Sequence, residues 1–286
     1  MWILTAIFQA IGQALTWILP ISESGHSAVF HDFSSRFTDA CSKLTGVIHI
    51  GIAIGIIIAF YKLFLTLLKN FFGGWNDLFH KRLDVKNPSA QRRFMYMTIL
   101  SFIPMIFYAI PAGKYGNVYQ LFHRVSYNGN LLGEGICIAL TGVLIITAIA
   151  MKDKKSSIKI PPFLQALIIG VIAFLTVPVS GTSLVAGVLF IGMLLGMSDK
   201  IALRYSMVMS VMVLIVMGIV EICIGVTDVK AVAVILALVV SILFSFFTVK
   251  LLIFFIKKNY IKYFAWYDIV LGGICFIVGI FEIVLK

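Results

Sequence analysis

The chain has 286 residues, of which 61% are hydrophobic and 12% charged, and its mean hydropathy is +1.06. Soluble domains are roughly 45–50% apolar and about 25% charged, so these values exclude a water-soluble globule, a disordered chain and a fibrous protein. The formal charge is +11, but Lys and Arg lie in short segments between apolar stretches. This placement is typical of cytoplasmic loop anchors and not of nucleic-acid binding.

The apolar stretches predict an all-α, polytopic membrane protein. Segments such as Val47–Phe60 are apolar on every face, whereas a membrane β-barrel alternates apolar and polar residues. A transmembrane helix needs about 20 mostly apolar residues. Six segments meet this requirement plainly: Leu44–Thr66, Phe94–Ala112, Leu131–Met151, Ala202–Gly225, Ala231–Ile256 and Ala265–Leu285.

Two further apolar stretches contain breaks. Trp2–Phe33 is interrupted at Pro20–Gly25, and Pro162–Met197 is interrupted at Pro178–Thr182. Proline removes a helical donor and clashes with the preceding turn, and the neighbouring Ser and Gly favour caps and turns. We therefore predict that each stretch is a helical hairpin folded at its break.

The positions of Lys and Arg orient these elements. Basic residues cluster near residues 67–93, 152–161 and 257–264, which the positive-inside rule places in the cytoplasm. Counting spans then requires Pro162–Met197 to enter and leave on the cytoplasmic face, and by analogy Trp2–Phe33 enters from outside.

This arrangement predicts one membrane domain, residues 1–286, built from two inverted repeats. The repeats comprise residues 1–151 and 162–286, each with one re-entrant hairpin and three transmembrane helices. Unpaired backbone is costly in lipid. We therefore expect the two fold points to meet near the midplane and form one polar site.

The first fold point carries ionisable residues at membrane depth, which are usually functional. Glu23 and His26 are three residues apart, so a helix would place them on one face. In a plainer alternative, Glu23 lies near the surface and His26 caps a helix. A metal site from Glu23, His26 and His31 is a weaker alternative. The other intramembrane acids, Glu134, Glu221 and Glu282, stand alone in the sequence and are expected to be span ends or helix-packing polar contacts.

The second fold point carries Ser180, Gly181, Thr182 and Ser183 just before an apolar helix. Backbone N–H groups at a helix start, beside hydroxyls and a glycine, can cradle an anion. Plain N-capping by the same residues is the alternative.

Both fold points resemble signatures of one family. Ala14–His26 resembles the first signature of the bacterial undecaprenyl-diphosphate phosphatases of the bacitracin-resistance type, and Ser180–Ser183 with Gly192–Ser198 resembles the second. The resemblance implies a multi-pass enzyme of the bacterial plasma membrane. Such an enzyme removes one phosphate from undecaprenyl diphosphate at the outer face, recycling the lipid carrier for wall synthesis.

Several family positions differ in this chain. The two acidic positions of the first signature fall on Gln13 and Trp17, a hydroxyl position falls on Glu23, and the arginine of the second falls on Leu184. A leucine cannot form the bidentate hydrogen bonds to phosphate that an arginine forms.

The resemblance and the chemistry together assign provisional roles. The expected catalytic residues are His26, Glu23, Ser22 and Ser24. The expected phosphate-binding residues are Ser180, Gly181, Thr182, Ser183 and Gln13. No cofactor is certain, and Mg²⁺ or Ca²⁺ is an open alternative.

The expected partner is a polyprenyl diphosphate among the membrane lipids, and a homodimer stays open. Since broken helices in inverted repeats also suit transporters, the alternative function is non-catalytic transport of a polyprenyl phosphate. A structural membrane scaffold is a third alternative.

Overall fold

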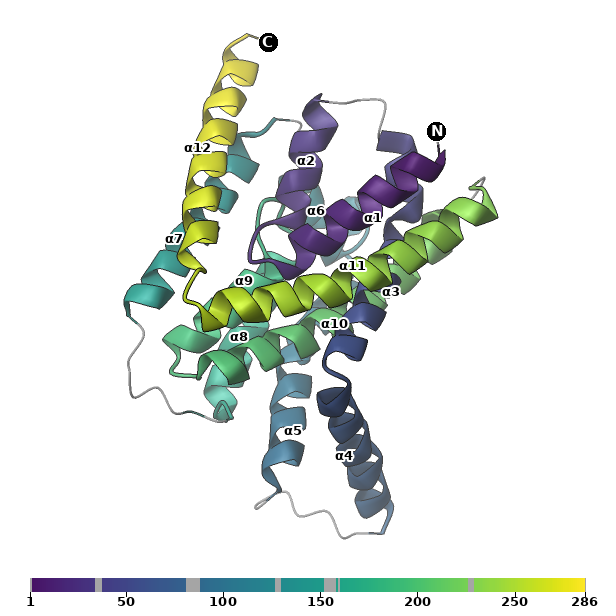
Figure 1. Cartoon of the computed structure of the whole chain (residues 1–286), viewed down its shortest axis with the longest axis vertical. Coiled ribbons are helices and arrows are strands. Elements are labelled where there is room, and N and C mark those ends of the chain that lie inside the picture. The colour runs from purple at the N-terminus through teal and green to yellow at the C-terminus, as the bar shows by residue number, and fades with distance from the viewer. Residues whose placement is uncertain are drawn as a thin grey trace.

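The structure, a computed structural model, describes residues 2–33, 38–80, 88–126, 130–151, 158, 160–225 and 229–285. Within these ranges the chain is helical and has no strand, which confirms the predicted all-α class (Figure 1). The α-helices of the described part are α1 (Trp2–Ile18), α2 (Glu23–Phe33), α3 (Thr38–Ala59), α4 (Tyr61–Phe79), α5 (Ala90–Phe102), α6 (Val118–Ser126), α7 (Leu132–Ala150), α8 (Phe163–Thr176), α9 (Leu184–Leu194), α10 (Asp199–Gly225), α11 (Ala231–Lys257) and α12 (Lys262–Val284). Two short 3-10 helices cover Ile103–Ala109 and Gly113–Tyr115.

Four of the described helices, α7, α10, α11 and α12, are each long and apolar enough to cross a membrane. They coincide with four of the predicted spans. Large apolar side chains such as Phe247 on α11 and Phe281 on α12 are exposed. Such faces suit contact with lipid, because a helix pairs its own backbone polar groups. The protein is therefore a multi-pass membrane protein.

The predicted span Leu44–Thr66 is not one straight helix. The chain bends by 94° between α3 and α4, and Phe60 at the break leaves the helical region with φ −113° and ψ 31°. Helix α4 carries Lys62 and Lys69 as well as the exposed aromatic side chain of Trp75, a mixture that suits a membrane interface. No proline or glycine stands at residues 57–63 to mark the bend in the sequence.

The predicted single span Phe94–Ala112 is also wrong. Its α-helix ends at Phe102, and the chain continues as the 3-10 helix Ile103–Ala109. Pro104 stands in the first turn of that 3-10 helix. A proline there has no N–H to pair with the preceding turn, so it ends α5 but is tolerated where a new helix begins.

Both predicted breaks are present. The chain leaves the helix between α1 and α2 at residues 19–22, and between α8 and α9 at residues 177–183. Gly181 in the second turn has φ +86°, a conformation that costs other residues about 1–2 kcal/mol. The two breaks thus lie where the sequence predicts them. Their relation as halves of an inverted repeat, residues 1–151 and 162–286, stays a prediction.

Small residues let α3 pack closely in the centre of the bundle. A Cβ at Gly46 would lie 2.8 Å from the carbonyl oxygen of Gly218 on α10. A Cβ at Gly51 would lie 1.8 Å from the hydroxyl oxygen of Ser241 on α11. Membrane helices approach closely at such small residues because dispersion contacts and hydrogen bonds hold them together there. Helix α3 therefore lies between α10 and α11, with α1 beside it.

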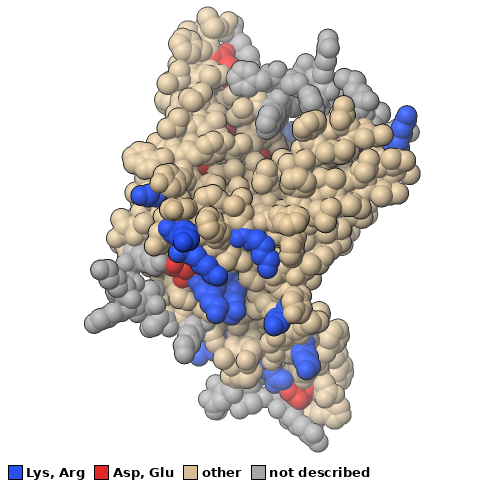
Figure 2. Space-filling view, viewed as in Figure 1, with Lys and Arg blue, Asp and Glu red and all other residues tan. Residues whose placement is uncertain are grey.

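Positive charge is concentrated in one half of the molecule. Figure 2 shows most of the visible Lys and Arg in the middle and lower parts of the view, near the junction of α11 and α12 and over the α4–α5 pair, with one residue at the upper right. Basic residues of these elements are Lys62, Lys69, Arg92, Arg93, Lys257, Lys258 and Lys262. This distribution agrees with a common cytoplasmic side for the segments near residues 67–93 and 257–264.

Candidate functional site

The two turns lie against each other, as their sequences predict. The Ser22 hydroxyl donates a 2.8 Å hydrogen bond to the carbonyl oxygen of Thr182. In return, the backbone N–H of Gly181 donates to the Ser24 hydroxyl oxygen at 3.1 Å. The Ser22 oxygen also accepts the N–H of Gly25 at 2.9 Å. Ser22 is 1% exposed, so these bonds form a buried junction between the first and second turns.

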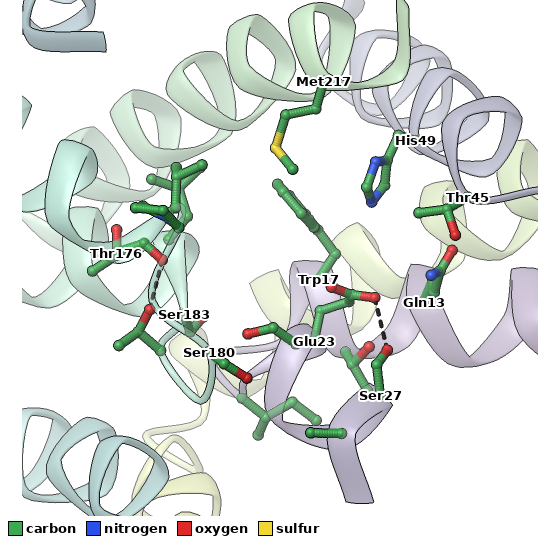
Figure 3. Close-up of a pocket in the computed structure, with 18 of the residues that line it drawn as sticks. Gln13, Trp17, Glu23, Ser27, Thr45, His49, Thr176, Ser180, Ser183 and Met217 are labelled. Atoms are coloured by element: carbon green, nitrogen blue, oxygen red, sulfur yellow. Dashed lines mark hydrogen bonds between the residues drawn. The ribbon is translucent and has the colours of Figure 1, made fainter. Parts of the chain in front are cut away.

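A cavity of about 380 Å³ opens beside this junction (Figure 3). Side chains of α1, α2, α3, α6 and α10 line it together with the second turn and the start of α9. The predicted site residues among its lining are Gln13, Glu23, Ser24, Ser180, Thr182 and Ser183. The structure therefore brings most of the predicted residues from both turns to one cavity.

Three predicted site residues do not line the cavity. Ser22 and Gly181 lie in the junction between the turns. The Nδ1 of His26 donates to the Ser22 carbonyl oxygen at 2.6 Å, and its Nε2 lies 2.7 Å from the Tyr267 hydroxyl of α12. The ring also stacks on Tyr267. Both ring nitrogens of His26 are therefore engaged by neighbours that hold the first turn against α12.

The hydroxyls of the second turn are largely engaged within the protein. The Ser183 hydroxyl oxygen accepts the N–H of Ala186 at 3.2 Å, so the N-cap alternative holds for this residue. The Thr182 hydroxyl lies 2.6 Å from the carbonyl oxygen of Thr176, and Ser180 forms a side-chain hydrogen bond with Glu134. A phosphate at this turn would therefore contact a preorganised polar wall whose hydroxyls already have partners.

The cavity also contains a pair of ionisable residues that the sequence motifs do not predict. Nδ1 of His49 on α3 lies 2.7 Å from Oε2 of Glu221 on α10. His49 is 2% exposed, and its ring centroid is 5.1 Å from that of Trp17. Glu221 is therefore a polar contact between packed helices, as expected, but its place in the cavity was not predicted. A histidine within an otherwise apolar span was the available signal.

Glu134 likewise makes a polar packing contact, because its carboxyl group is hydrogen-bonded to Ser180. These pairings join helices far apart in the sequence. They depend on helix packing, which a list of polar residues in separate spans does not show.

Several lining residues carry buried polar atoms with no hydrogen-bond partner among the described groups. These are Oε1 of Gln13, Nε1 of Trp17 and Nε2 of His49. Buried polar atoms nearly always have a partner, and in a polar cavity a ligand or water supplies it. Figure 3 shows His49 and Gln13 on one side of the cavity and Ser180 and Ser183 on the other. Polar groups therefore face this space from two sides.

The described side chains do not make up a preformed cation site. Glu23 and Glu221 both line the cavity, and carboxylates are ligands that Mg²⁺ and Ca²⁺ prefer. However, no group of three or more His, Cys, Asp or Glu side chains is placed to hold a metal ion within the described residues. The side chain of His31, part of the alternative metal set, lies outside them.

Residues 6–274 match the family described as bacitracin resistance protein BacA. The chain belongs to the BacA family. Both turns and every cavity-lining residue, from Gln13 to Glu221, fall within the matched region. The BacA-family match therefore includes the whole candidate site.

Relatives of this BacA-family chain include three proteins named undecaprenyl-diphosphatase. The one from Methanosphaera stadtmanae is 28% identical, with 99% of this chain and 98% of the relative covered. The one from Halothermothrix orenii is 26% identical, with the same two shares covered. The one from Acinetobacter baumannii is 25% identical, with 98% of this chain and 96% of the relative covered. The chain is thus similar to these proteins over nearly its full length.

Proposed function

We propose that the chain is an undecaprenyl-diphosphate phosphatase of the bacterial plasma membrane. It would convert the lipid diphosphate to undecaprenyl phosphate and inorganic phosphate at the outer face. The observation that carries this proposal is the cavity where the two turns meet, lined by polar residues from both. Its volume of about 380 Å³ lies within the range of small-molecule sites. Membership of the BacA family and the names of the relatives support the same activity.

Residues of the two turns would contact the terminal phosphate from opposite sides. Glu23 and Ser24 line the cavity, so we place them beside the terminal phosphate. Ser180, Thr182 and Ser183 would form the opposite wall, where the first N–H groups of α9 favour negative charge. Gln13 would contact a phosphate oxygen through its amide group. Mutual positioning of this kind supplies much of the catalysis in phosphoryl transfer.

Ser22 and His26 would act as positioning residues. Ser22 joins the first turn to the second, and His26 joins the same turn to Tyr267 of α12. Each would keep Glu23 and Ser24 oriented without touching the phosphate. This proposal changes the direct catalytic roles predicted for these two residues from the sequence.

Transport without hydrolysis is the second candidate. Leu184, at the position of the family's arginine, lines the cavity, and no Lys or Arg is among the lining residues of the described chain. Phosphoryl transfer normally needs cationic stabilisation of the transferred group. A cavity without such a side chain favours binding of a lipid phosphate over turnover.

Phosphate release from undecaprenyl diphosphate by purified protein in detergent tests the proposal. We expect release by the natural chain and a loss of at least tenfold in kcat for Glu23→Gln. Glu282→Gln is the matched control, because Glu282 lies outside the cavity and accepts the N–H of Leu131, which a glutamine can also do. Absence of release by the natural chain would overturn the proposal, and lipid binding in that case would support transport.

A further inference from the structure

We infer that His49 and Glu221 form the acid–base unit of the cavity, with His49 as general base for attack on the terminal phosphate. The inference rests on the proposed phosphatase function and assigns one of its steps. It replaces His26, which the sequence favours for this role, with a histidine that lines the cavity. Four observations carry it.

The first observation is the position of His49. It lies in the middle of α3, is 2% exposed and lines the cavity. Burying an ionisable side chain at membrane depth is costly. A buried histidine in a span can be a packing residue, but this one lines a polar cavity and has a buried ring nitrogen without a partner among the described groups. That combination points to contact with a ligand.

The second observation is the pairing with Glu221. Its carboxylate accepts the Nδ1–H of His49 at 2.7 Å, because an ionised carboxylate can only accept. The hydrogen on Nδ1 leaves Nε2 of the neutral ring with a lone pair. Glu221 thus fixes the tautomer and the ring orientation, as the acid does in a nucleophile–histidine–acid arrangement. It also offsets the charge that forms when Nε2 takes a proton.

The third observation is the contrast with His26. Its Nδ1 must donate to the Ser22 carbonyl, which leaves Nε2 to accept from the Tyr267 hydroxyl. No ring nitrogen of His26 remains for a substrate in this arrangement. Nε2 of His49 has no such partner among the described groups. Of the two histidines, His49 has the free acceptor.

The fourth observation concerns charge. The side chains lining the cavity include the acids Glu23 and Glu221 but no Lys or Arg. His49 is the lining residue of the described chain that can become cationic near pH 7. Protonation of Nε2 during the reaction would therefore place positive charge beside the phosphate oxygens. Nε1–H of Trp17, also unpartnered, would add a neutral donor on the same side.

The step balances without an oxidant or reductant. A water oxygen forms a bond to the terminal phosphorus, and its proton passes to Nε2 of His49. The bond between that phosphorus and the bridging oxygen breaks, so the lipid leaves as its monophosphate. The proton on Nε2 then passes to the released phosphate, which restores the neutral ring.

Phosphate release from undecaprenyl diphosphate by the full-length protein in detergent tests the inference. We expect His49→Gln to lower kcat by about 10²–10⁴-fold, the usual contribution of a general base, with KM changed less than about threefold. Glutamine can still donate to Glu221, so the helix contact is kept. His80→Gln is the matched control, because His80 caps the end of α4 through the Asn76 carbonyl, and its kcat should equal that of the natural chain.

A second variant separates a chemical role from a structural one. His49→Ala leaves space for added imidazole, which should restore release at least tenfold in this variant and leave His80→Ala unchanged. Thermal unfolding of each variant in detergent shows whether the fold is kept. If natural protein releases phosphate and folded His49→Gln retains more than a third of its kcat, the inference is wrong while the phosphatase function stands. No release by the natural protein overturns both.

Discussion

The Ser22 hydroxyl donates a hydrogen bond of 2.8 Å to the carbonyl oxygen of Thr182, 160 residues further along the chain. This bond ties the first turn to the second at the edge of the cavity. A carbonyl in a broken helix has no i+4 donor, so in a membrane it must find another partner. Ser22 supplies that partner. The junction between the turns thereby gives a hydrogen bond to a backbone carbonyl that the break would leave unpaired.

Ser22→Ala should therefore destabilise the protein. The change leaves the Thr182 carbonyl and the Gly25 N–H without their buried partner, which costs about 1–3 kcal/mol. Unfolding in detergent measures the loss. Ser210→Ala is the control, because the buried Ser210 hydroxyl has no hydrogen-bond partner among the described groups. The role given to Ser22 fails if both variants are as stable as the natural chain.

Gly181→Ala should disrupt the second turn. Gly181 has φ +86°, and a Cβ there would lie 2.7 Å from the Glu134 carbonyl oxygen. The conformation alone costs about 1–2 kcal/mol for a residue other than glycine, and the contact adds to that. We expect lower stability and at least a tenfold loss of phosphate release, because the turn forms one wall of the cavity.

Gly12→Ala is the matched control for that change. Gly12 lies within α1, and a Cβ there meets nothing within 4 Å. Alanine in a helix interior is favoured over glycine by about 0.5–1 kcal/mol, so stability should be equal or higher. Equal melting temperatures for Gly181→Ala and Gly12→Ala would contradict the account of the turn.

The sequence predicts the parts of this structure that depend on local chemistry. Pro20 and Pro178 mark the two breaks, because a proline removes a helical hydrogen-bond donor whatever the helix packs against. The meeting of the turns follows from the cost of unpaired backbone in lipid. The bend at Phe60 leaves no such local mark, since no proline lies near it in the sequence.

The His49–Glu221 pair shows why the rest of the site was missed. The two residues are 172 positions apart, and their pairing requires α3 and α10 to pack in one particular register. Each residue taken alone is an ionisable group within an apolar span. Polar residues in different spans should therefore be considered as candidate pairs even when neither stands beside a motif.

Tyr267→Phe tests the positioning role of His26. The change removes the hydroxyl 2.7 Å from Nε2 of His26 but keeps the aromatic ring and the bond from His26 to Ser22. A typical hydrogen bond contributes about 0.5–1.5 kcal/mol, so unfolding in detergent should show a loss of that size. The kcat for phosphate release should fall by no more than about threefold, because the remaining bond to Ser22 still holds the ring and His26 does not touch the substrate. A hundredfold fall in kcat with the stability unchanged would instead point to a direct chemical role for His26.

Gly46→Ala tests whether close packing of α3 on α10 sets the His49–Glu221 pair. A Cβ at Gly46 would lie 2.8 Å from the Gly218 carbonyl oxygen and 2.9 Å from Cβ of Glu221. The helices must separate to admit it, and overpacking of this kind costs about 1–3 kcal/mol.

Because Gly46 is one turn from His49, the separation should also weaken the hydrogen bond between His49 and Glu221. We expect Gly46→Ala to lose at least tenfold in kcat, with little further loss when it is combined with Glu221→Gln, since both changes act on the same pair. Gly273→Ala on α12, where a Cβ meets nothing within 4 Å, should leave kcat unchanged. Fully additive losses in the double variant would mean that Gly46 affects the site by another route.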